Sequence, residues 1–209
     1  MRNLASLSVS ILLVPIFATT SCRNLPEIPG TSVRVLYSEG GISTKKPVDI
    51  VVAPVRDETG LAMAPCDMLR VAFAEALVRR RYSPLSLEYI SSTLETEAGA
   101  TGGAAAPIPA SYHPGTLGED AVLRVAVKTW DMTNWEQEQQ LGVIIDTWMV
   151  DSVDPLGTEL WGARYEKMLD MGLEKNTYPT ESVLMKYCCE VIATEIMDCM
   201  PARTPRPGL

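Results

Sequence analysis

The alternation of hydrophobic and polar positions predicts a domain that opens with a buried strand and a helix. Val48–Val55 (VDIVVAPV) is a short, almost continuous apolar run, which is typical of a strand buried on both faces. From about Pro65 to Arg81 the apolar residues recur as on one face of a helix, namely Leu69, Phe73 and Leu77 together with Met68, Ala72 and Ala76. A second strand is expected at Leu85–Ile90, and Ser92 is expected to begin a short helix after it.

The carboxy-terminal half predicts three antiparallel strands and a last helix. The strands are expected at Ala121–Trp130, Leu141–Val153 and Thr158–Lys167, with a polar hairpin tip at Asn134–Gln140. The helix from Thr180 carries the apolar stripe Met185, Cys188, Cys189, Ile192, Ile196 and Met200. The order of these elements predicts an α+β fold: a mixed sheet of about five strands, parallel at its start and an antiparallel meander at its end, with two long helices on one face.

The amino terminus carries the features of an export signal. Arg2 precedes an apolar stretch, Leu7–Ala18, that is too short to span a bilayer comfortably, and small polar residues then lead to Cys22. A cysteine in this position resembles the lipobox of bacterial lipoproteins, although Thr19 stands where that pattern has an aliphatic residue. The resemblance implies that the signal peptide is cleaved and that Cys22 carries palmitate-type acyl chains. The alternative is ordinary cleavage, with Cys22 a free or disulfide-bonded residue.

Composition divides the chain into four parts. We expect a signal peptide at 1–21, a lipidated tether rich in Pro, Gly and Ser at 22–47, one α+β domain at 48–200, and a disordered tail at 201–209. A short strand at Val33–Tyr37 fits within the tether. Within the domain, residues 98–115 form a low-complexity flexible loop insertion. Arg23 is not the aspartate that retains such lipoproteins in the inner membrane, so the outer membrane, facing the periplasm, is the expected location.

The charge and composition of the 209-residue chain argue against several classes of function. The formal net charge of -8 provides no basic footprint for nucleic acid. The single histidine, His113, lies in the loop insertion, so neither a catalytic triad nor a histidine-built metal site is expected. The paired carboxylates Asp57/Glu58, Glu119/Asp120 and Asp151/Asp154 stand at turns or strand ends, where solvated side chains are common. We therefore expect no enzyme activity, no metal and no cofactor.

The cysteines allow one structural hypothesis. Cys66 opens the first long helix, and Cys188, Cys189 and Cys199 lie on the last one. If the two helices pack side by side, Cys66 could form a disulfide with Cys188, Cys189 or Cys199 in an oxidising periplasm. Buried unpaired thiols are the alternative.

The four tryptophans are the candidates for a partner surface. By strand alternation Trp130 points away from the face that Leu123, Val125 and Val127 share. Trp135 lies at the expected hairpin tip, and Trp148 and Trp161 belong to adjacent strands where they could pair across the sheet. The functional interpretation is an apolar patch for self-association or for another envelope protein. The alternative is that all but Trp135 cover the second face of the sheet within the monomer.

Four segments carry a family resemblance, namely VDIVVAPVRDETG, AFAEALVRRRYSPLSLEYI, LGEDAVLRVAVKTWD and DSVDPLGTELWGARYEK. They resemble segments of a family of bacterial outer-membrane lipoproteins related to the amino-terminal domain of TolB and to the periplasmic domains of CsgG and LpoB. The resemblance implies a TolB-N-like fold and a non-enzymatic accessory or scaffold in envelope assembly, secretion or transport, acting through protein–protein contacts. A lipid- or peptide-binding carrier, with residues 98–115 as its lid, is the main alternative, and a periplasmic hydrolase is a more distant one.

Overall fold

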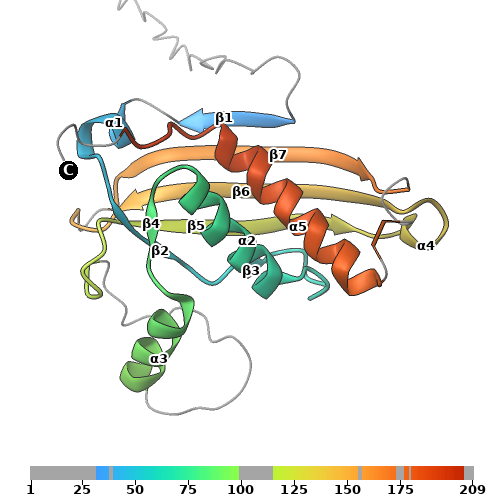
Figure 1. The fold of residues 1–209 in the computed structure, drawn as a ribbon, viewed down its shortest axis with the longest axis horizontal. Helices are drawn as coiled ribbons and strands as arrows, with labels where there is room; N and C mark the ends of the chain where they lie inside the picture. Colours follow the sequence, from blue (N-terminus) through green and yellow to red (C-terminus); the bar gives the residue numbers. More distant parts are fainter. Residues whose placement is uncertain are drawn as a thin grey trace, which may run out of the picture.

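The computed structural model describes residues 32–37, 40–98, 115–154, 157–172, 177–178 and 180–204. Seven strands and five helices lie within these ranges (Figure 1). The strands are β1 (Val33–Tyr37), β2 (Asp49–Val52), β3 (Arg56–Asp57), β4 (Ser83–Pro84), β5 (Ala121–Asp131), β6 (Gln140–Asp151) and β7 (Glu159–Asp170). The helices are α1 (Gly41–Lys45), α2 (Cys66–Arg79), α3 (Leu87–Ala98), α4 (Trp135–Glu138) and α5 (Glu181–Asp198).

The strands form one mixed sheet in the order β1-β7-β6-β5-β2-β4, with β3 paired to β5. Strand β2 is parallel to β4, because the crossover between them passes through α2. It is also parallel to β5 on its other side. Strands β5, β6 and β7 pair antiparallel in sequence order, and β1 adds to β7 at the edge. The predicted α+β class, with a parallel start and an antiparallel meander, is confirmed.

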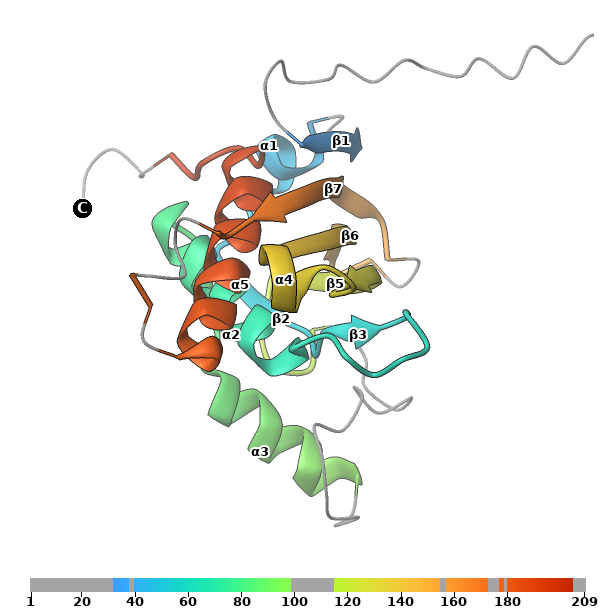
Figure 2. The same ribbon diagram turned by 90° about the vertical axis from the view of Figure 1, so that its right-hand side faces the viewer.

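Helices α2 and α5 lie side by side and cover one face of the sheet (Figures 1 and 2). Their predicted apolar stripes are buried there against β5, β6 and β7, and together they make the main core. A smaller cluster occupies the opposite face, where Ile90 of α3 packs against Val51, Val122 and Val150. Beyond this cluster the second face of the sheet has no helix over it in Figure 2.

Part of the predicted tether belongs to the folded domain. Val33–Tyr37 pairs with β7, and Gly41 of α1 packs so closely on the Leu160 backbone that a Cβ there would lie 2.8 Å from the Leu160 carbonyl oxygen. The predicted domain start at residue 48 is therefore too late. The edge strand buries Val33 and Val35 on the helix side, which explains why these residues are apolar.

The predicted strand at Leu85–Ile90 is wrong. Only Ser83–Pro84 pair with β2, and α3 begins at Leu87. Ser86 starts this helix, since its hydroxyl accepts a hydrogen bond from the Tyr89 N–H at 3.3 Å and its carbonyl accepts one from the Ile90 N–H. Ser92, predicted to begin a helix, lies inside α3 and donates to the Tyr89 carbonyl.

The first residues of the predicted tail are held against the domain. The Tyr82 hydroxyl donates to the Pro201 carbonyl at 2.8 Å, and the Arg203 N–H donates to the Arg80 carbonyl at 3.0 Å. The chain therefore stays attached to the end of α2 up to Arg203, beyond the boundary predicted at residue 201. Residues 205–209 lie outside the described ranges.

Candidate interaction surfaces

The carboxylates at the start of β5 hold the backbone together. The Glu119 carboxylate accepts hydrogen bonds from the N–H groups of Gly115 and Leu117, at 2.6 and 2.9 Å. The Asp120 carboxylate accepts from the N–H groups of Val48 and Asp49, which join β2 to β5. Asp151 at the end of β6 forms an ion pair with Lys45 at 2.7 Å. Each of these carboxylates therefore has a structural partner.

Three of the four tryptophans proposed for a partner surface are buried. Trp130, Trp135 and Trp161 all belong to the main core between the sheet and the helices. They cannot form an exposed patch, so the prediction of a surface made from all four is wrong. Trp161 lies opposite Met149 on β6, on the helix side of the sheet, whereas Trp148 lies on the other side. The expected pairing of Trp148 with Trp161 is therefore absent.

A β-bulge explains the error for Trp130. Val127 lies opposite Ile145 and Thr129 lies opposite Ile144, so Lys128 is an extra residue in β5. The extra residue reverses the alternation of side chains beyond it. Trp130 consequently lies opposite Val143 and joins the core face that Val125 and Val127 share.

Trp135 lies in α4 at the β5–β6 connection, and it packs inward toward the amino end of α5. Its indole N–H donates to the Glu181 carboxylate at 3.1 Å. The short helix therefore ties the hairpin to the helix layer, which explains a large apolar side chain at this position.

Trp148 is the one proposed residue on a partly exposed face. It lies on the sheet side opposite α2 and α5, between Arg124 on β5 and Gly162 on β7. The Arg56 guanidinium lies over its ring at 5.2 Å from the ring centre, in a cation–π contact. Arg164, on the same face, pairs with Asp146 at 3.5 Å. Trp148 also packs on the cluster that contains Ile90 of α3.

The loop between β3 and α2, residues 58–65, presents the most exposed apolar side chains near a cavity. Leu61 is 68% exposed and Met63 is 51% exposed. Hydrogen bonds to Asp57 fix the conformation of the loop. The Asp57 carboxylate accepts from the Thr59 N–H and hydroxyl, at 2.9 and 2.6 Å, and from the Ala64 N–H at 3.1 Å. We call residues 58–65 the β3–α2 loop.

The charge of Asp57 strengthens that arrangement. Partial burial alone would raise the pKa of its carboxyl group, but the hydrogen bonds from Thr59 and from the backbone of Ala64 and Met63 outweigh burial and lower the pKa. The carboxylate is therefore ionised at neutral pH, where it accepts these bonds best. The loop also keeps Ala62 at a φ of 52°, a left-handed conformation that costs a residue with a Cβ about 1–2 kcal/mol.

Beside this loop lies a cavity of about 730 Å³. It lies between the β3–α2 loop, the β5–β6 connection with α4, and the amino end of α5. Its apolar lining consists of Met63, Met132, Trp135, Tyr178 and Leu184, and its polar lining of Thr133, Glu136, Gln137, Gln139, Thr180 and Glu181. The sequence prediction missed this site, because the residues that line it come from three separate segments.

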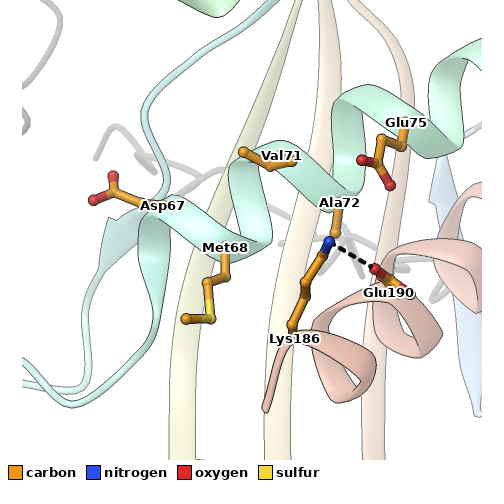
Figure 3. A pocket seen from close by; sticks show the side chains of 7 residues that line it. All are labelled: Asp67, Met68, Val71, Ala72, Glu75, Lys186 and Glu190. Carbon is orange, nitrogen blue, oxygen red and sulfur yellow. Dashed lines mark ion pairs between the residues drawn. The ribbon is translucent and has the colours of Figure 1, made fainter. Parts of the chain in front are cut away.

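A second, smaller hollow of about 240 Å³ lies between α2 and α5 on the outer surface of the helix layer (Figure 3). Met68, Val71 and Ala72 form its apolar floor. Asp67 and Glu75 of α2 and Lys186 and Glu190 of α5 surround it, and Lys186 pairs with Glu190 at 3.7 Å. We call this hollow the α2–α5 groove.

The four described cysteines are free thiols, so the predicted disulfide of Cys66 with Cys188, Cys189 or Cys199 is absent. Cys188 and Cys189 are residues of α5 and lie fully buried in the main core. Cys66 and Cys199 are partly exposed at helix ends. Burial raises the pKa of Cys188 to about 11. Burial, together with the negative charges of Cys188 and Glu190, raises the pKa of Cys189 to about 12.

These environments predict which thiols react. Because the thiolate is the reactive form, Cys188 and Cys189 should resist a disulfide-exchange reagent at pH 8 in the folded protein. After denaturation without reductant, all four thiols should be modified, as counted by mass spectrometry of the peptides. Recovery of a disulfide-linked peptide pair containing Cys66 would contradict the free-thiol structure.

Cys22, the signal peptide and His113 lie outside the described residues, as does most of the 98–115 insertion. Among the described helices, none combines the length and the apolar character needed to cross a bilayer. Within the described ranges no three His, Cys, Asp or Glu side chains gather as a metal site requires.

Comparison with known proteins gives a distant likeness in fold. No protein-family model matches the sequence, and no curated protein is similar to it. Among solved structures, a PelC dodecamer variant from Paraburkholderia phytofirmans is 11% identical with a TM-score of 0.49, over 82% of this chain and 98% of that chain. The lipoprotein GNA1162 from Neisseria meningitidis is 19% identical with a TM-score of 0.48, over 70% of this chain and 96% of that chain. The relation to TolB, CsgG and LpoB rests on the sequence resemblance alone.

Proposed function

We propose that this protein is a non-enzymatic lipoprotein of the bacterial outer membrane, anchored through acylated Cys22 and facing the periplasm. In this proposal it is an accessory in envelope assembly, secretion or transport, and it binds a partner protein through the β3–α2 loop and the adjoining cavity. The observation that carries the binding proposal is the exposure of Leu61 and Met63 on a loop that Asp57 holds in one shape.

Preorganisation supports a binding role for this loop. Ordering a flexible loop on association opposes binding, whereas a loop already fixed by hydrogen bonds avoids most of that cost. The left-handed Ala62 is a further sign, because unfavourable backbone conformations concentrate at functional sites. No folding reason is visible for exposing Leu61 and Met63 on such a loop.

The surroundings of the loop fit a protein partner. Protein interfaces combine an apolar centre with a polar rim. Here Met63 lines the cavity together with Met132 and Trp135, and Leu61 lies two residues before Met63 in the same loop. Gln137, Gln139 and Thr133 supply polar groups in the cavity lining. Methionine side chains adapt to the shape of a partner, which suits a site built from Met63 and Met132.

The test is a paired substitution on the loop. In the full-length anchored protein, Leu61→Ser with Met63→Ser should reduce the main co-purifying partner at least about tenfold in affinity capture from membranes in mild detergent. The folded domain should keep its unfolding temperature, since both side chains are mainly exposed.

Tyr89→Ser is the matched control. Tyr89 is 51% exposed, as Met63 is, but it lies on α3, so its loss should leave the captured partner unchanged. Equal capture by the loop variant and the unmodified protein would contradict the proposed surface, and so would an equal loss in both variants.

The size of the cavity favours one alternative function, a carrier for a lipid or a peptide. Ligand cavities usually measure about 300–1,000 Å³, and about 730 Å³ lies in that range. The described flanks of the predicted lid, Ala98 and Gly115, precede β5 in the chain, whereas Met132 of the cavity follows the end of β5. A ligand that native mass spectrometry detects, and that Met132→Trp displaces, would favour the carrier.

A further inference from the structure

The α2–α5 groove carries features that neither the core nor the proposed loop surface explains. Its floor of Met68, Val71 and Ala72 is apolar, and it opens to solvent on the side of the helix layer away from the sheet (Figure 3). Val71 is 41% exposed and Val78, seven residues later on the same side of α2, is 58% exposed. On α5, Val183 is 41% exposed. The apolar surface therefore continues beyond the groove along both helices.

Valine is a poor choice for an exposed helix position. Its branched side chain loses rotational freedom against the preceding turn, so its helix propensity is lower than that of alanine. Much of the side chain of Val71 and Val78 contacts only solvent, so the burial of apolar surface offsets little of this loss in helix propensity. Contact with something outside the chain gives a physical reason for both residues.

The charges around the groove indicate what that contact would be. Asp67 and Glu75 lie along α2 on one side, separated by eight residues or about 12 Å along the helix axis. Glu190 lies across the groove on α5. Among the described residues that line the groove, Lys186 is the one basic residue, and it pairs with Glu190. An apolar floor beneath an excess of carboxylates suits an apolar segment that carries positive charges.

We propose that the α2–α5 groove docks an amphipathic helix of a partner protein, with aliphatic residues on one stripe and Lys or Arg beside it. Helices bind in such grooves through residues spaced i, i+3 or i+4, and i+7. An aliphatic pair one heptad apart matches Val71 and Val78, and basic residues about two turns apart match Asp67 and Glu75. This surface lies outside the β3–α2 loop and its cavity, so the inference stands independently of the proposed function.

Two synthetic helical peptides of about 18 residues test the charge requirement. The basic one has Leu at heptad spacing flanked by Lys and Arg, and the acidic one has Glu at each of those basic positions. Fluorescence anisotropy against the full-chain protein in detergent should give at least about tenfold tighter binding of the basic peptide at low salt. Glu75→Lys should weaken that binding about fivefold or more and should improve binding of the acidic peptide.

Variants of the valines separate docking from a structural role. Val71→Ala with Val78→Ala should weaken the basic peptide severalfold while the unfolding temperature stays within about 2 °C, because alanine favours the helix. If the two valines were needed only for folding, the unfolding temperature would fall and the affinity for the basic peptide would stay the same. Glu166→Lys, the same change at an exposed position on β7, is the matched control and should leave peptide affinity unchanged.

Three results would overturn the inference. They are equal binding of the two peptides, equal weakening by Glu166→Lys and Glu75→Lys, and a lowered unfolding temperature of the valine variant with unchanged peptide affinity. Concentration-dependent self-association of the protein that Glu75→Lys abolishes would also overturn it, since the occupant would then be a second copy. Failure of the peptide experiments leaves the Leu61 and Met63 test unaffected.

Discussion

Trp161→Ala is expected to lower the free energy of unfolding by about 3–5 kcal/mol, the usual cost of removing a large aromatic side chain from a core. Trp161 is fully buried on β7, between the sheet and the helix layer. For a domain of this size the unfolding temperature should fall by about 10 °C. Urea or thermal unfolding followed by circular dichroism measures both quantities.

Trp161→Phe serves as the control. Among the described residues, the buried indole N–H of Trp161 has no hydrogen-bond partner, so phenylalanine loses no hydrogen bond and keeps most of the apolar contact. It should cost less than half as much stability as alanine. A Trp161→Ala protein that unfolds like the unmodified protein but loses a binding partner would contradict the buried position and restore the surface interpretation.

Cys22→Ser should move the protein from the membrane fraction almost completely into the soluble fraction. Each buried methylene of an acyl chain contributes about 0.8 kcal/mol to membrane binding, so several long chains hold the protein far more firmly than one. Serine offers no thiol for a thioether-linked lipid. Membrane fractionation followed by mass spectrometry of the amino-terminal peptide measures the result.

Cys199→Ser is the control for Cys22→Ser. Cys199 is a partly exposed free thiol at the end of α5, so its replacement should leave the protein in the membrane fraction. An unmodified sulfur at Cys22, on a protein recovered wholly from the soluble fraction, would contradict the anchor and with it the proposed location.

The long elements could be predicted because their sequence pattern is consistent over many residues. Helices α2 and α5 and the strands β5, β6 and β7 all agree with the predicted elements to within a few residues. The short segment Leu85–Ile90 was wrongly predicted as a strand, since Leu85, Leu87 and Ile90 suit either a strand or a helix. Ser86 favours the helix by capping its first turn. The hydrogen bonds within the helix outweigh the pairing with β2, which only Ser83 and Pro84 make.

The candidate sites were less predictable than the fold. The sequence drew attention to the tryptophans because large aromatic residues are common in interfaces, but three of the four are in the core. The β3–α2 loop offered a weaker signal, two large apolar residues between Gly60 and Pro65 with no periodicity. Its importance depends on Asp57, which fixes the loop, and on α4 and α5, which complete the cavity.

By itself, the sequence determined the α+β class and the residues of the two core-facing helix stripes, and it alone predicts an export signal ending at Cys22. These depend on local composition and on periods of two or 3.6 residues, which can be counted along the chain. The tertiary structure alone decided which face each side chain occupies and which segments meet. One extra residue, Lys128, turned Trp130 inward, and packing placed Asp67, Glu75 and Glu190 around one groove. Contacts between distant segments depend on register and packing that no local pattern records.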